Sequence, residues 1–232
     1  MQTSSLHYRT SVTAAALGLF LLNASTLKIE AQEPVQVYIM MGQSNMLANG
    51  DVNGGTEGRL DYAVDTKGLY PYLKDGDGNW TEWDDVRFTR VQGSGGQSGN
   101  GTGSVLNNEW LSVDGENRIG VEYGIGHHIG QALEAPVLLL KSAIGNRALG
   151  WDLLPPGGVQ YDHADGYTYP GSGGSPERWL TGTTPVPIGW YAGVQYQGDV
   201  TRAKNVLASL GTYYPGATSY EVAGFFWWQG DR

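Results

Sequence analysis

Short apolar runs alternate with amphipathic stretches along the chain. The apolar runs cover residues 35–41, 136–144 and 221–228, and each is followed by a glycine or by Gln-Gly. Runs that are short and almost wholly apolar are typical of strands buried on both faces of a parallel sheet. Residues 120–133 and 193–210 carry apolar side chains at helical spacing. This alternation predicts an α/β fold, a three-layer α/β/α sandwich with a mostly parallel sheet.

Two glycine-rich stretches, residues 51–120 and 152–190, separate these elements and are typical of long loops. Within the first, Asp75–Asn79 begins like a calcium-binding loop. However, Trp80 stands where the sharp-turn glycine belongs, and Val86 stands where the bidentate glutamate belongs. The segment is therefore predicted to be a turn. The second stretch follows a strand's carboxyl end, so we expect it to cover a cleft there.

Composition narrows the classes of function. The 232 residues suffice for one domain with a sizeable core. A net charge of −9 argues against nucleic acid and anionic membrane as partners. Cysteine is absent, which excludes disulfides, a thiol nucleophile and a thiolate metal site. We expect neither a metal nor a cofactor, and the many tryptophans and tyrosines suit either a core or sugar-stacking surfaces.

Residues 1–31 resemble a secretory signal in the order of their parts. An arginine precedes an apolar run, Val12–Leu22, and cleavage would follow Ala31 or, alternatively, Ala24. The apolar run is shorter than the roughly 20 residues that span a bilayer. An uncleaved anchor is the other interpretation. We expect the segment to be removed, which leaves residues 32–232 as a secreted or periplasmic domain with no membrane attachment.

The first apolar run leads into Gly42, and Ser44 follows two residues later. In an open parallel sheet, ligands bind at the carboxyl ends of the strands. Ser44 is therefore predicted to lie at the mouth of a cleft, close to backbone N–H groups that can face an anion. That position suits a nucleophile. The spacing alone also fits a serine that caps the following helix.

Three blocks of sequence resemble the SGNH hydrolase superfamily, in its sialate O-acetylesterase-like branch, also called carbohydrate esterase family 6. They are Gly42–Met46, Lys141–Leu149 and Trp227–Gly230, and they occur in the order found in that family. In the second block, Asn146 replaces a glycine that the family usually has. Asparagine tolerates positive φ, so the turn can survive the replacement. The resemblance implies a flavodoxin-like α/β sandwich.

The resemblance also implies a function, a serine esterase that removes O-acetyl groups from carbohydrates of the sialate or xylan type. By this likeness, Ser44 is the nucleophile. The oxyanion would be bound by the N–H groups of Ser44 and Gly145 and by the side-chain amide of Gln229. The residues expected to bind the acetylated sugar are Gln43, Asn146, Arg147 and Trp151.

The general base is the missing part of this site. In the family, a histidine preceded by an aspartate lies in a later block, and nothing in residues 35–232 corresponds to it. We therefore expect a chain that is incomplete at its C-terminus and impaired in activity.

His127 and His128 are adjacent on a predicted helix and point about 100° apart, so they do not form one site. His163 is expected at the surface. A non-catalytic carbohydrate-binding protein and an inactive fragment remain alternatives, and the oligomeric state is open.

Overall fold

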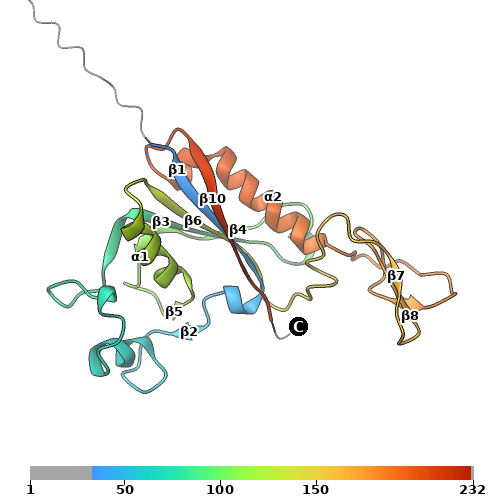
Figure 1. Cartoon of the computed structure of the whole chain (residues 1–232), viewed down its shortest axis with the longest axis horizontal. Helices are drawn as coiled ribbons and strands as arrows, with labels where there is room; N and C mark the ends of the chain where they lie inside the picture. The colour runs from blue at the N-terminus through green and yellow to red at the C-terminus, as the bar shows by residue number, and fades with distance from the viewer. Residues whose placement is uncertain (1–32, 231–232) are drawn as a thin grey trace, which may run out of the picture. The chain divides into compact units, whose positions relative to one another are not determined.

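The computed structural model describes residues 33–230, which are built around a central sheet of five strands (Figure 1). The strand order is β10-β1-β6-β3-β4. The pairs β10–β1, β1–β6 and β6–β3 are parallel, and the pair β3–β4 is antiparallel. The strands are β1 (Val35–Gly42), β3 (Glu82–Gln92), β4 (Ser104–Ser112), β6 (Val137–Ser142) and β10 (Tyr220–Trp228).

Two smaller antiparallel sheets and three α-helices complete the described elements of regular structure, apart from short turns of 3₁₀ and π helix. One small sheet pairs β2 (Gly50–Asp51) with β5 (Arg118–Ile119). The other contains β7 (Tyr161–Asp162), β8 (Tyr167–Tyr169) and β9 (Trp179–Leu180). The helices are α1 (Glu122–Ala132), α2 (Val194–Ala208) and α3 (Leu210–Tyr213).

The predicted three-layer α/β/α sandwich with a mostly parallel sheet is wrong. The fold is β-rich, with a mixed central sheet and two further antiparallel sheets. The prediction missed β3 and β4, because both lie in the stretch 51–120 that was predicted to be a loop. Charged residues interrupt β3, among them Asp84, Asp85 and Arg87, so its apolar positions form no continuous run.

The core lies on both faces of β6, whose residues are all buried. Leu139 packs into the hydrophobic cluster that includes Tyr123 of α1. Leu138 and Leu140 point to the opposite face and pack with Ala203 of α2. Each face of the sheet is thus covered by one helix over β6 and β3.

The third apolar run forms a strand, but it is not buried as predicted. β10 is the edge strand of the central sheet. Val222 is 56% exposed and Phe225 is 55% exposed. An apolar run in sequence could not distinguish a central strand from an uncovered edge strand.

The small sheet β7–β9 lies away from the predicted cleft. Figure 1 shows β7 and β8 beyond the end of α2, far from the point where β1 and β10 end. The expectation that residues 152–190 cover the cleft therefore fails for this sheet.

The predicted turn at Asp75 is confirmed, because its carboxylate Oδ1 accepts hydrogen bonds from the N–H groups of Asp77 (2.9 Å) and Asn79 (2.8 Å).

The predicted signal segment, residues 1–31, lies outside the described residues. Within residues 33–230, the structure contains no helix with the length and apolar character needed to cross a bilayer.

Gly42 ends β1 at a point where no side chain fits. Its φ is +143°, and a Cβ at this position would lie 2.1 Å from the carbonyl oxygen of Trp228. A side chain at position 42 would therefore clash with the backbone of β10 where the two strands end.

Gly42→Ala is expected to lower the free energy of unfolding by about 3 kcal/mol, because it combines a backbone clash with an unfavourable φ. Gly96→Ala is the matched control, since nothing lies within 4 Å of its added Cβ. The control should stay within about 0.5 kcal/mol of the parent chain. Urea denaturation measures both variants, and equal losses would contradict the steric argument.

A buried ion pair joins α1 to β6. The Nζ of Lys141 lies 2.5 Å from Oε2 of Glu122, and Lys141 is wholly buried. Burial lowers the pKa of Lys141, and the Glu122 carboxylate opposes this shift. The Oε1 of Glu122 also accepts a hydrogen bond from the N–H of Gly120 at 3.1 Å.

Lys141→Met is expected to cost about 3–5 kcal/mol of unfolding free energy, because it leaves the Glu122 carboxylate buried without its cation. The double variant Lys141→Met/Glu122→Met should lose less than the sum of the two single variants, since neither charge is then left alone. A double-mutant cycle by urea denaturation tests this, and strictly additive losses would contradict it.

Candidate functional site

The carboxyl ends of β1, β6 and β10 meet around Ser44. Gly42 pairs with Trp228, and the N–H of Gln43 donates a hydrogen bond to the carbonyl of Trp228 at 3.3 Å. A 3₁₀ turn begins at Ser44 directly after β1. A Cβ built on Gly145, in the loop after β6, would lie 3.7 Å from the Cβ of Ser44. The backbone of that loop therefore runs against the predicted nucleophile.

Gln43 links Ser44 to the end of β10. Its side chain is fully buried, its Nε2 donates a hydrogen bond to the carbonyl of Gly230, and its Oε1 accepts one from the Ser44 hydroxyl. Sequence analysis assigned Gln43 to sugar binding, whereas these contacts give it a part in holding the site together. An amide oxygen is too weak a base to remove the serine proton.

Gln229 ties the end of β10 to the loop after β6. Its Nε2 donates a hydrogen bond to the carbonyl of Arg147 at 3.0 Å. The next residue, Gly230, lies close to the 3₁₀ turn, because a Cβ on it would be 3.0 Å from Nδ2 of Asn45. The three residues predicted to bind the oxyanion thus come from three segments that meet at one edge of the sheet.

The loop after β6 adopts the turn expected from its sequence. Asn146 has a φ of 59°, which confirms that asparagine takes the left-handed conformation here. The guanidinium carbon of Arg147 lies 5.4 Å from the centroid of the Trp190 ring. Its Nε donates a hydrogen bond to Oε1 of Gln195 at 3.1 Å. Arg147 is therefore held in place by a ring and by α2.

Trp190 lies beside this loop and is more exposed than Trp151. Trp151, which was predicted to hold the sugar, is only 8% exposed. Trp190 is partly exposed, and its Nε1 donates a hydrogen bond to Oδ1 of Asp152 at 2.8 Å. The Oδ2 of Asp152 accepts a second hydrogen bond from the N–H of Ala148 at 2.6 Å. Sequence analysis did not identify Trp190, because it lies 39 positions beyond Trp151 in a stretch of irregular backbone.

A buried polar network continues from Arg147 into α2. The Nε2 of Gln195 donates to Oδ1 of Asp199 at 2.8 Å, and Nη2 of Arg202 donates to the same oxygen at 2.6 Å. Asp199 and Arg202 are charged, yet both side chains are buried. Their spacing with Gln195, at intervals of four and three residues, is the signal that they share a face.

Burial raises the pKa of Asp199 from 3.8 to about 6, and the hydrogen bond from Arg202 opposes this rise. The folded protein therefore holds a proton on this carboxyl more tightly than the unfolded chain does. The contribution of Asp199 to stability is greatest at low pH and is lost as the pH rises through about 6.

The three described histidines do not lie on the segments that meet at Ser44. The ring of His127 stacks on that of Tyr72, with centroids 4.0 Å apart. Burial lowers the pKa of His127, and the neighbouring His128 lowers it further. His163 lies after β7, where its Nδ1 is 3.2 Å from Oδ1 of Asp165. Among the residues that the structure describes, no group of three or more His, Cys, Asp or Glu could hold a metal ion.

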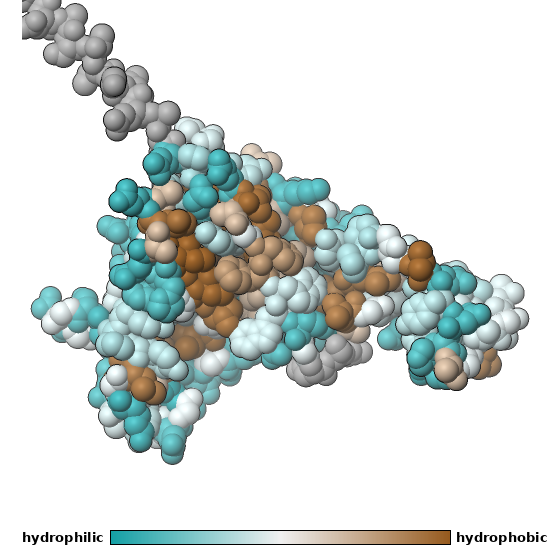
Figure 2. Space-filling model, in the orientation of Figure 1, coloured by the Kyte–Doolittle hydropathy of each residue, from teal (hydrophilic) through white to brown (hydrophobic). Residues whose placement is uncertain are grey.

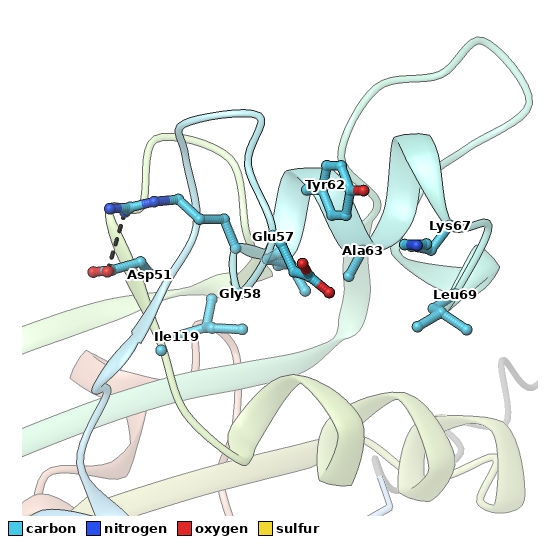
Figure 3. Close-up of a pocket in the computed structure, with 11 residues that line it drawn as sticks. Asp51, Glu57, Gly58, Tyr62, Ala63, Lys67, Leu69 and Ile119 are labelled. Atoms are coloured by element: carbon cyan, nitrogen blue, oxygen red, sulfur yellow. Dashed lines mark ion pairs between the residues drawn. The ribbon is translucent and has the colours of Figure 1, made fainter.

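A pocket of about 440 Å³ lies near the β2–β5 sheet, on other segments than those around Ser44 (Figure 3). Figure 3 shows the ion pair of Asp51 at one end and Tyr62, Lys67 and Leu69 at the other. The ion pair joins Oδ2 of Asp51 to Nη1 of Arg59 at 3.1 Å. Sequence analysis did not anticipate this pocket.

No protein-family model and no curated protein matches this chain. The resemblance to SGNH hydrolases therefore rests on the three short sequence blocks alone.

Asp199→Asn should remove one source of the protein's pH dependence. We expect the stability of the parent chain relative to this variant to fall by about 1–3 kcal/mol between pH 4 and pH 7, because the parent loses its tightly held proton over this range. Urea denaturation of both proteins at a series of pH values measures the difference. Parallel profiles would contradict a carboxyl that titrates near pH 6.

Proposed function

We propose that this chain carries the nucleophile and the oxyanion-binding groups of a serine esterase that removes O-acetyl groups from carbohydrates. The observation that supports this most is the position of Ser44. It lies two residues beyond the end of β1 and against the backbone of Gly145. Nucleophile and N–H donors must lie this close together for acyl transfer.

In the proposed reaction, the Ser44 oxygen attacks the acetyl carbonyl carbon. The resulting oxyanion is stabilised by the N–H groups of Ser44 and Gly145 and by the amide of Gln229. Each such donor is worth about 3 kcal/mol in comparable sites. Collapse of the intermediate releases the sugar hydroxyl and leaves an acetyl-serine, and water then releases acetate and restores Ser44.

The sugar would lie along the loop after β6. Arg147 and Asn146 offer polar groups there, and Trp190 offers a flat apolar ring that suits a pyranose face. The net charge of −9 does not favour nucleic acid as a substrate. The order of charged, apolar and small residues in 1–31 supports a secreted or periplasmic protein.

The rate of this reaction is limited by the weak proton acceptor beside the Ser44 hydroxyl. The Ser44 hydroxyl donates to the side-chain oxygen of Gln43, which is neutral. Without a histidine, sites of this kind retain only the effect of the oxyanion donors and of binding. The proposal therefore includes slow turnover by this chain alone.

A second candidate is carbohydrate binding without turnover. One observation favours it. Trp228 is 46% exposed, and its backbone pairs with that of Gly42, two residues before Ser44. The Ser44 hydroxyl donates to an amide oxygen, which is not a general base. The two candidates differ in whether acetate is released.

Added imidazole should separate the candidates, because it can act as the general base that the neutral Gln43 amide cannot provide. With acetylated xylo-oligosaccharide or O-acetylated sialic acid, we expect imidazole to raise acetate release by the chain about tenfold or more above that of Ser44→Ala. Acetate release is measured over a range of imidazole concentrations.

Imidazole hydrolyses esters slowly by itself, so Ser44→Ala provides the background, and Ser104→Ala controls for loss of an exposed serine. Ser104→Ala should behave as the parent chain. Equal release by the parent and Ser44→Ala would contradict the esterase proposal. Sugar binding by both, with no release above background, would favour the second candidate.

A further inference from the structure

β10 presents an open backbone edge. Within residues 33–230 it pairs with β1 on one side and with no strand on the other. The N–H and C=O groups of an unpaired edge bind most completely to another strand, which supplies the matching row of donors and acceptors. The binding partner that best fits this edge is therefore another β-strand.

The side chains of β10 leave this edge unprotected. Natural edge strands usually carry lysines, prolines or inward-pointing charges that prevent pairing. β10 contains neither lysine nor proline, and its one charged residue is Glu221. The last five residues, Gly224–Trp228, are uncharged. Figure 2 shows hydrophobic residues gathered over the part of the surface where β1 and β10 lie.

The opposite edge of the sheet differs. β4 contains Asn107, Asn108 and Glu109 at its centre. The amide of Asn107 donates a hydrogen bond to Glu109, so pairing there would remove water from a charged group. Of the two edges, β10 is the one suited to an apolar strand.

A bulge divides β10 into two parts. Val37 pairs with Val222, whereas the next residue, Tyr38, pairs with Gly224, so Ala223 is the extra residue. A bulge bends the strand and disturbs regular pairing. The regular part of the edge is thus the uncharged segment Gly224–Trp228.

Aromatic side chains lie on both faces of this segment. Phe225 lines a pocket of about 290 Å³ with Ile39 and with residues of α2. Its ring is stacked on that of Trp227, with centroids 6.1 Å apart. On the other face, Phe226 contacts Tyr38 at a centroid distance of 6.0 Å.

We propose that β10 pairs in the antiparallel direction with β10 of a second copy of this chain. Full overlap of Gly224–Trp228 with itself has its centre at Phe226. Phe225 of one copy then lies opposite Trp227 of the other, and the two Phe226 residues face each other. Aromatic pairs directly opposite each other stabilise antiparallel strands. The segment is therefore complementary to itself, which a two-fold symmetric dimer requires.

The dimer follows from strand and side-chain geometry and does not depend on esterase activity. The two-fold axis stands perpendicular to the sheet, so α2 of both copies lies on the same face. The central sheets join into one, and the edge that each monomer exposes is closed.

Light scattering after size-exclusion chromatography tests the proposal with the full chain. We expect the parent chain to have twice the monomer mass of 25.0 kDa. Phe225→Lys should convert it to the monomer, because a lysine would replace an apolar side chain in the pair. Val105→Lys on β4 is the matched control, since Val105 is similarly exposed, and it should remain dimeric. Circular dichroism confirms that each variant is folded.

A cysteine variant checks the register independently of stability. The chain contains no cysteine, so a single introduced thiol can react only with its counterpart. Phe226→Cys should form an intermolecular disulfide on mild oxidation, because residues facing each other across an antiparallel pair have Cα atoms about 4.5–5.5 Å apart. Val222→Cys, before the bulge, should not. A monomeric parent chain, a dimer lost in Val105→Lys, open-ended oligomers, or a disulfide only in Val222→Cys would each overturn the proposal.

Discussion

The ion pair between Lys141 and Glu122 is the contact on which the arrangement around Ser44 depends most. A wholly buried ammonium is stable only with a close anion, and Glu122 at the first turn of α1 provides it. The pair thereby fixes where α1 begins against β6. Lys141 lies four residues before Gly145, so the constraint acts on the strand that carries the oxyanion loop.

A second buried network acts on the same loop from the other face of the sheet. Asp199 and Arg202 form an ion pair inside α2, Gln195 joins it, and Gln195 also accepts a hydrogen bond from Arg147. The loop after β6 is thus held between two charged networks, one under each helix. Burying charges is costly, and here both pairs adjoin the segment whose position the proposed chemistry requires.

The sequence predicted local features better than the architecture. β1, β6, α1 and α2 lie within a few residues of the predicted ranges, because their apolar positions follow a clear period. The positive φ of Asn146 agrees with the expectation that asparagine tolerates this conformation where the resembled family usually has a glycine. The sheet was mispredicted, since β3 mixes charged and apolar residues. Burial of Asp199 was missed as well, because one helix face cannot show in sequence that its charges pair with each other.

The site also depends on a strand that is itself poorly supported. Within residues 33–230, β10 pairs with a strand on one side only, yet it leads into Gln229 and Gly230, whose hydrogen bonds hold Arg147 and Gln43. Fraying of an unpaired edge strand would loosen both bonds, and with them the surroundings of Ser44. Pairing along the outer edge of β10 therefore does more than bury apolar rings. It stabilises the strand that closes one side of the candidate site, so association and the geometry around Ser44 are coupled through β10.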